Sequence, residues 1–119
     1  MAGGDIYQKI KEKNEMSETY ICYIFCQILK GMRFLHLNDV IHRDIKPDNI
    51  LISDNSQFPV VRLADFSLAD YYKNKNLRLK CGTPGYMAPE VFEGEIYDDK
   101  VDIFSLGIVL YMMYNQIIY

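Results

Sequence analysis

A long amphipathic stretch near the start of the chain is the strongest structural signal in the sequence. Its apolar residues recur at helical spacing: Ile21, Ile24, Phe25, Ile28, Leu29, Met32 and Leu35. This pattern predicts a helix with one apolar stripe of about five turns, which must pack against another element. Ser17 is a suitable N-cap, and Glu18 is favourable in the first turn. Asn38 and Asp39 then end the helix.

The segments on either side of this helix are shorter. Ile6 and Ile10 are one helical turn apart and predict a short helix through Lys11, followed by a polar break at Asn14 to Ser17. Val40 and Ile41 form a short β-type run. The runs 50–52 and 60–63 flank turn-forming residues and predict a small β hairpin. The stretch from Tyr71 to Lys80 is polar and aperiodic, which predicts an exposed loop.

The last predicted helix, Lys100 to Tyr114, is apolar on nearly every side. Its apolar part, Ile103 to Tyr114, is too short to span a bilayer, so we expect a buried core helix and no membrane span. The predicted fold class is therefore mainly α with a small β hairpin. A length of 119 residues fits a single small domain.

Composition limits the classes of partner and compartment. The chain is 50% hydrophobic and 24% charged with a net charge of -3, which is typical of a globular domain and argues against nucleic acid as a main partner. Three cysteines without a signal peptide predict a cytoplasmic, reducing location. Cys22 and Cys26 share a helix face, where core packing is favoured over a zinc site because two further ligands are missing.

Three polar motifs carry the chemical information. His42-Arg43-Asp44-Ile45-Lys46-Pro47-Asp48-Asn49 lies between two short strands, and it is followed in order by Asp65-Phe66 and Ala88-Pro89-Glu90. Together they resemble the catalytic loop, the metal-binding D-F-G element and the A-P-E motif of eukaryotic-type protein kinases. Lys46 and the run Cys81 to Tyr86 resemble the Ser/Thr branch. The combined pattern is most similar to the calcium/calmodulin-dependent kinase group.

The resemblance implies a role for each matching residue. Phosphoryl transfer depends mainly on positioning and charge neutralisation. Asp44 is expected to accept the proton of the substrate hydroxyl, and Lys46 to reach the γ-phosphate. Asn49 and Asp65 are expected to hold Mg²⁺, which prefers hard oxygen ligands. The resemblance further implies that ATP contacts Lys46, Asn49, Leu51 and Asp65. It also implies that Thr83 hydrogen-bonds to Asp44 and Lys46.

The resemblance also implies which part of a kinase domain is present. Residues 1–119 are similar to an incomplete large lobe, from the segment after the hinge, beginning at Met1, to the central buried helix. His42, Phe66 and Asp102 would form a structural column, so His42 is expected to pack rather than act as an acid or base. No glycine-rich loop or ATP-binding lysine is recognisable, and Glu90 lacks its usual arginine partner. Alone, the chain is expected to be inactive, to expose apolar patches and to aggregate.

Two positions depart from the kinase pattern. Ser67 stands where kinases have glycine, which restricts the backbone but leaves the Asp65 carboxylate in place. Leu79 stands where a phosphorylated residue commonly pairs with the arginine equivalent to Arg43. No Ser or Thr occurs between Leu68 and Lys80. We therefore expect that Ser/Thr phosphorylation in this stretch does not activate the protein.

The leading functional hypothesis is a fragment of a protein Ser/Thr kinase that uses ATP and Mg²⁺. Its partners would be protein substrates, with Asp5 and Asp48 selecting basic residues upstream of the phosphoacceptor. Solvated surface carboxylates are an equally good interpretation of these two residues. The alternative function is a pseudokinase or non-catalytic scaffold that retains the fold. Ser67 and the missing lobe favour this alternative. An active parent is favoured by the intact Asp44, Lys46, Asn49 and Asp65.

Overall fold

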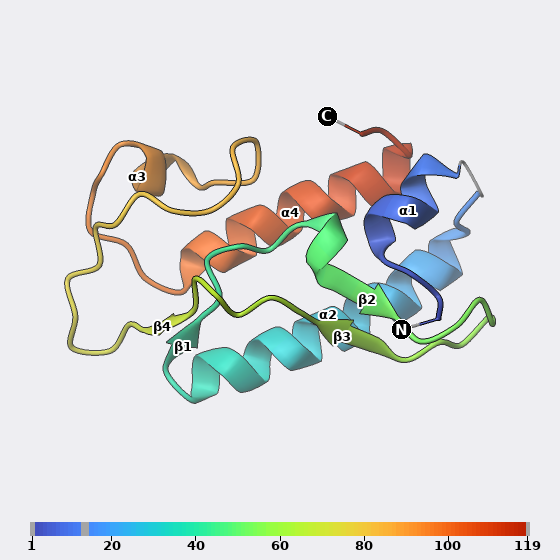
Figure 1. The fold of residues 1–119 in the computed structure, drawn as a ribbon, viewed down its shortest axis with the longest axis horizontal. Coiled ribbons are helices and arrows are strands. Elements are labelled where there is room, and N and C mark those ends of the chain that lie inside the picture. Colours follow the sequence, from blue (N-terminus) through green and yellow to red (C-terminus); the bar gives the residue numbers. More distant parts are fainter. Residues whose placement is uncertain (1, 13–14, 119) are drawn as a thin grey trace.

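The computed structural model describes residues 2–12 and 15–118, and Figure 1 shows their arrangement. The elements, in order, are α1 (Ile6–Lys11), α2 (Glu18–Leu37), β1 (Val40–Ile41), the 3₁₀ helix η1 (Pro47–Asn49), β2 (Ile50–Ile52), β3 (Val61–Leu63), β4 (Asp70–Tyr71), α3 (Pro89–Phe92) and α4 (Lys100–Asn115). The expectations for Met1 and Asn14 fall outside the described residues. The fold is helical with two small sheets, which confirms the predicted class.

Helix α2 forms as its sequence predicts. The Ser17 hydroxyl accepts a hydrogen bond from the Tyr20 backbone N–H at 3.1 Å, which caps the first turn. Asn38 is the C-cap. The buried residues of the helix are Ile21, Ile24, Ile28 and Met32. They form the centre of the predicted stripe, whereas Leu29 at its edge is 42% exposed.

The predicted positions of two cysteines in the core are wrong. Cys22 and Cys26 are exposed and free, because they lie on the side of α2 opposite the buried isoleucines. Within residues 2–12 and 15–118, no group of three or more His, Cys, Asp or Glu side chains is arranged to hold a metal ion. Both thiols lie on the solvent-facing side of α2.

The predicted hairpin is confirmed, and a second sheet accompanies it. Strands β2 and β3 pair antiparallel, with Ile50 opposite Leu63 and Ile52 opposite Val61. Strand β1 pairs with β4, where Ile41 lies opposite Asp70. The prediction that an exposed loop begins at Tyr71 is thus wrong for that residue, because Tyr71 belongs to β4. In Figure 1, β1 and β4 lie beside the end of α2, away from the hairpin.

Helix α4 is buried along one side only. Leu106, Val109, Met112 and Met113 join the core that α2 and the hairpin also contribute to. In contrast, Ile103 is 50% exposed and Tyr111 is 52% exposed. The expected core helix is therefore buried on one side, and no described element covers its outer side. The expected exposure of apolar side chains is confirmed. None of the described helices is both long and apolar enough to cross a bilayer.

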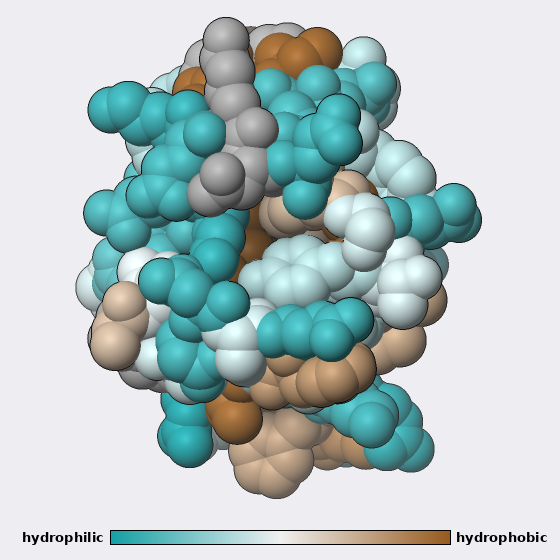
Figure 2. Space-filling view, turned by 90° about the vertical axis from the view of Figure 1, so that its right-hand side faces the viewer, coloured by the Kyte–Doolittle hydropathy of each residue, from teal (hydrophilic) through white to brown (hydrophobic). Residues whose placement is uncertain are grey.

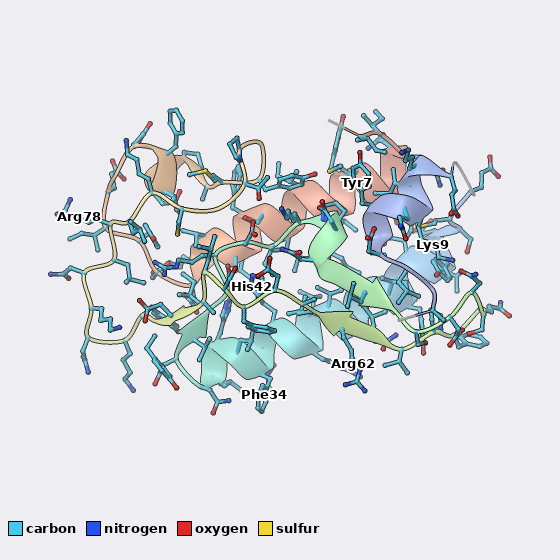
Figure 3. All side chains as sticks on the ribbon, in the orientation of Figure 1. Tyr7, Lys9, Phe34, His42, Arg62 and Arg78 are labelled. Carbon is cyan, nitrogen blue, oxygen red and sulfur yellow. The ribbon has the colours of Figure 1, made fainter. Side chains whose placement is uncertain are left out.

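The end of the molecule near α1 has a hollow in its surface. Figure 2 shows this end, where hydrophilic residues surround a hollow. Tyr20, Tyr23 and Phe58 are among the residues that line a cavity of about 320 Å³ between α1, the start of α2 and the hairpin turn. In Figure 3, His42 lies at the centre of the fold, whereas Phe34 lies on the outside of α2 and Arg78 on an outer loop. The polar motifs therefore converge away from this hollow.

Candidate active site

The loop from His42 to Asn49 is fixed at both ends by buried strands. Ile41 at the end of β1 and Ile50 at the start of β2 are both fully buried. Between them, Pro47 begins η1, where its fixed φ angle suits the first helical turn. Asp44 lies in this loop and is only 8% exposed. The local sequence thus places an acidic side chain at the edge of the core.

Three of the predicted site residues contact the Asp44 side chain. The Thr83 hydroxyl donates to Asp44 Oδ1 at 2.7 Å. Asn49 Nδ2 donates to the Asp44 backbone oxygen at 2.9 Å and to Asp44 Oδ2 at 3.3 Å. Lys46 Nζ lies 3.9 Å from Asp44 Oδ2. A buried carboxylate needs such partners to remain charged, and these groups fix its orientation.

The expected contact between Thr83 and Lys46 is not formed in the described part of the chain. There, Lys46 approaches Asp44 Oδ2 and Thr83 bonds to Asp44 Oδ1. The two side chains therefore lie on different oxygens of one carboxylate. Among the described residues this direct bond is therefore absent, because Lys46 Nζ lies near Asp44 Oδ2 and not at the Thr83 hydroxyl oxygen, which has the lone pairs to accept it.

His42 is fully buried and both of its ring nitrogens are used. Its Nε2 lies 2.9 Å from the Ala64 carbonyl oxygen, and its Nδ1 accepts from the Asp44 backbone N–H at 3.1 Å. Because a carbonyl only accepts, Nε2 carries the proton and the ring is neutral. The ring also packs edge-on against Phe66, with 4.9 Å between centroids. These contacts support the packing role predicted for His42.

Asp102 of α4 holds the backbone of the loop. It is 1% exposed, and its carboxylate accepts from the backbone N–H groups of His42 and Arg43, both at 2.9 Å. This confirms the expected link between the loop and the central helix. Arg43 has a φ of 70°, a left-handed conformation that is strained for a side chain with a Cβ. The two hydrogen bonds to Asp102 compensate for that strain.

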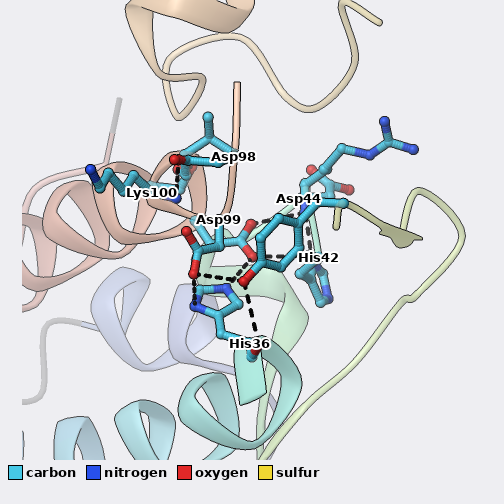
Figure 4. Close-up of polar contacts among 11 residues, drawn as sticks. His36, His42, Asp44, Asp98, Asp99 and Lys100 are labelled. Carbon is cyan, nitrogen blue, oxygen red and sulfur yellow. Dashed lines mark hydrogen bonds and ion pairs between the residues drawn. The ribbon is translucent and has the colours of Figure 1, made fainter. Parts of the chain in front are cut away.

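His36 extends this cluster to the end of α2. Its Nε2 donates to Asp102 Oδ2 at 2.9 Å, and its Nδ1 lies 3.6 Å from Asp99 Oδ2. The Tyr72 hydroxyl donates to the same Asp99 oxygen at 3.1 Å. Figure 4 shows these contacts, with His36, His42 and Asp99 labelled. The cluster joins α2, α4 and the residue after β4 directly behind the loop.

Asp65 lies at the other side of the site, just after β3. It is exposed and has a φ of 56°. Its Oδ1 accepts from the Ser67 hydroxyl at 2.6 Å and from the Ser67 backbone N–H at 3.2 Å. The Ser67 hydroxyl is the main reason that the pKa of Asp65 is below its ordinary value, and the hydrogen bond from the Ser67 backbone N–H also lowers it. The residue that departs from the kinase pattern therefore contacts the predicted metal ligand.

The remaining predicted residues lie around this centre. Leu51 is half-buried on β2 and forms an isolated β-bridge with Asp5. Asp5 is the N-cap of α1, since its Oδ1 accepts from the Gln8 backbone N–H at 2.8 Å. Asp48 is exposed in η1, and its charge is one cause of the raised pKa of Tyr86, after burial of that ring. Asp48 thus faces solvent beside Tyr86, whereas one oxygen of Asp5 is engaged in capping.

Sequence reasoning missed several residues that support the site. His36 continues the helical stripe four residues after Met32, and that spacing is the signal that could have found it. Asp99, Tyr72 and Tyr97 carry no comparable signal. Tyr97 is 5% exposed and contacts both Arg43 and the Leu79 carbonyl. These residues become recognisable only when distant segments lie together.

Comparisons with known proteins agree with this geometry. Residues 1–119 match the family described as protein kinase domain. A probable myosin light chain kinase of Dictyostelium discoideum is 40% identical over 113 residues, which cover 93% of this chain and 29% of that protein. The SNF1-like protein kinase ssp2 of Schizosaccharomyces pombe is 41% identical over 114 residues, covering 94% of this chain and 19% of that protein.

A third relative matches the expected kinase group. Calcium-dependent protein kinase 3 of Plasmodium yoelii yoelii is 38% identical over 113 residues, covering 93% of this chain and 20% of that protein. The chain thus spans less than a third of each of these relatives. With the loop, the aspartate after β3 and the family match all in agreement, the chain belongs to the protein kinase domain family.

Proposed function

We propose that this chain is part of a protein Ser/Thr kinase, which transfers the γ-phosphoryl group of ATP to protein substrates. In this proposal, residues 1–119 form an incomplete large lobe that extends from just after the hinge to the central helix α4. The observation that carries the proposal is the set of contacts around Asp44, where Thr83, Asn49 and Lys46 all meet one buried carboxylate. Relatives named as serine/threonine-protein kinases support the same reaction.

Asp44 has the environment that a base for a substrate hydroxyl requires. Its side chain is mostly buried, so the proton acceptor is held in a fixed orientation. Thr83 occupies Oδ1, while Oδ2 faces Lys46 and Asn49. A substrate hydroxyl placed near Oδ2 would also lie near the Lys46 ammonium. That charge would stabilise the negative charge of the transferred phosphoryl group.

The oxygen atoms available for Mg²⁺ fit that ion. Asn49 uses its amide N–H₂ group for Asp44, which leaves its carbonyl oxygen to face a ligand. Asp65 uses Oδ1 for Ser67 and retains Oδ2. Mg²⁺ takes hard oxygen ligands, and in kinases one carboxylate and one amide suffice beside phosphate oxygens. When bound, it would neutralise phosphate charge. Leu51 and Lys46 would complete the contacts with ATP.

The substrate side of the site rests on Asp48. This carboxylate is exposed, lies four residues after Asp44 and is close enough to Tyr86 to raise its pKa. It could therefore pair with a basic residue of a substrate peptide without the cost of desolvating a buried group. Asp5 is a weaker candidate because capping of α1 uses one of its oxygens. The three free cysteines are consistent with an intracellular enzyme.

One observation favours the alternative of a pseudokinase. The Ser67 hydroxyl is 2.6 Å from Asp65 Oδ1, so one oxygen of the proposed metal ligand already has a partner. A ligand that required both oxygens of Asp65 would have to displace that hydroxyl. This alternative predicts a protein that retains the kinase fold and binds partners, with weak affinity for Mg²⁺ and nucleotide.

Phosphate transfer to a protein substrate distinguishes the two functions. The assay uses the full-length protein that contains this chain, radiolabelled ATP and Mg²⁺, with a basic Ser-containing peptide as the acceptor. Asp44→Asn should lower kcat by about a hundredfold or more, which is the upper range for loss of a positioned base. Asp54→Asn, in the exposed hairpin turn, is the matched control and should leave kcat unchanged. Equal activity in both variants would exclude the proposed function.

A further inference from the structure

The Arg43 guanidinium is buried, and three groups from other segments of the chain contact it. The Arg43 side chain is 8% exposed. Its Nε donates to the Leu68 carbonyl oxygen at 2.7 Å, and its Nη1 donates to the Tyr97 hydroxyl at 3.2 Å. A carboxylate oxygen of Asp70 lies 3.8 Å from Nη2. A buried guanidinium requires such partners, and all of these belong to this chain.

Tyr97 connects Arg43 to the irregular segment that precedes Thr83. Its hydroxyl accepts from Arg43 and donates to the Leu79 carbonyl oxygen at 2.6 Å. Its backbone N–H also donates to the Leu77 carbonyl oxygen at 3.0 Å. One buried residue therefore holds the segment at two points, by its backbone and by its hydroxyl. Thr83, which contacts Asp44, follows only four residues after Leu79.

The protonation state of Tyr97 suits this arrangement. Burial raises the pKa of Tyr97 above its ordinary value, while the nearby Arg43 has the opposite, smaller effect. The hydroxyl therefore keeps its proton at neutral pH and can donate to Leu79. Residues 68–80 contain no Ser or Thr that could carry a phosphate for Arg43 to bind.

We propose that Tyr97 is a positioning residue that orders the segment from Leu77 to Thr83 against Arg43 without phosphorylation of that segment. The inference rests on the proposed kinase function, because the ordered segment places Thr83 on Asp44. Arg43 already has its hydrogen-bond partners, so a phosphate is not needed to neutralise or orient it. In this proposal the Tyr97 hydroxyl lies between Arg43 and residue 79 and takes the place of a phosphate group on residue 79.

The test compares Tyr97→Phe with Tyr71→Phe in the full-length protein after exhaustive phosphatase treatment. Tyr71 is 63% exposed and serves as the matched control. Tyr97→Phe should lower kcat/KM for a peptide substrate about tenfold, as expected for one hydrogen bond to a charged group. The KM for ATP should not change. Amide hydrogen exchange should accelerate at residues 77–81, a local effect that general destabilisation would not produce.

A second variant, Leu79→Glu in the wild-type background, tests the inference even if Tyr97→Phe does not fold. The backbone carbonyl of Leu79 and the Arg43 guanidinium contact the same hydroxyl, so residue 79 lies close to Arg43, and we expect a carboxylate there to reach it. Leu79→Glu in the wild-type background should leave activity within about twofold, since Arg43 already has its partners. Combined with Tyr97→Phe, it should restore most of the lost activity.

Several results would overturn the inference. These are loss of wild-type activity on phosphatase treatment, activation by Leu79→Glu alone, or Tyr97→Phe with unchanged kcat/KM and unchanged exchange at residues 77–81. Failure of the proposed function is distinguishable from these. If the proposed function fails, either the wild type transfers no phosphate or Asp44→Asn leaves its transfer unchanged. The hydrogen-exchange comparison would still decide whether Tyr97 orders the segment.

Discussion

Replacement of Asp102 by Asn tests how the loop from His42 to Asn49 is held in its strained conformation. The Asp102 carboxylate accepts three hydrogen bonds at 2.9 Å, from the backbone N–H groups of His42 and Arg43 and from His36 Nε2. An Asn side chain of the same size has one oxygen and one N–H₂ group. At least one of the three donors would then face another donor in a site that is 1% exposed.

The expected loss of stability follows from these contacts. Leaving one buried N–H without an acceptor costs about 1–3 kcal/mol, and weakening the other charged hydrogen bonds adds about 1 kcal/mol. The total is about 2–4 kcal/mol for Asp102→Asn. Asp99→Asn is the matched control because Asp99 also contacts His36, at 3.6 Å, but its side chain is 30% exposed. A loss below about 1 kcal/mol is expected there.

Urea unfolding followed by far-UV circular dichroism measures both variants in the full-length protein. Linear extrapolation gives the free energy of unfolding for each variant. A difference between the two variants smaller than about 0.5 kcal/mol would refute the reasoning, because additive surface effects alone reach that size. The buried carboxylate would then not be what supports the left-handed Arg43.

Three further predictions follow from single contacts. Thr83→Val should lower kcat about tenfold, because it removes the hydrogen bond to Asp44, while Thr83→Ser should retain most activity; equal steady-state rates would contradict this. Ser67→Ala should raise the pKa of Asp65 toward its ordinary value in an NMR titration, and an unchanged pKa would assign the shift elsewhere. Because the folded-state pKa is depressed, Asp65 stabilises the fold above its ordinary pKa and loses that contribution as the pH falls. Ser17→Ala should destabilise α2 by about 1 kcal/mol in urea unfolding, whereas no change would show that the cap is dispensable.

Local patterns allowed much of the fold to be predicted. Helix α2 and its Ser17 cap follow from contacts within a few residues, which a 3.6-residue period and a capping residue specify directly. The β2–β3 hairpin was also predictable because its strands are close in sequence. The pairing of β1 with β4 was not. Two-residue strands show no alternation, and Asp70 is of a type that strands disfavour.

The candidate site divides in the same way. Asp44, Asn49 and Lys46 were predictable because they lie within six residues of one another in a recognisable loop. Their supports were not, since His36 and Asp102 are 66 residues apart, and Arg43 and Tyr97 are 54 apart. Which hydrogen-bonding groups face each other across such separations depends on how the helices pack.

The sequence by itself therefore determined the chemistry of this protein: the loop residues, their order and the family they indicate. Only the tertiary structure decided how that chemistry is supported. It exposes Cys22 and Cys26, leaves one side of α4 uncovered, and brings Tyr97 between Arg43 and Leu79. The physical reason is that residue types and local periods are written along the chain. Burial and long-range hydrogen bonds depend on which surfaces meet when the chain folds.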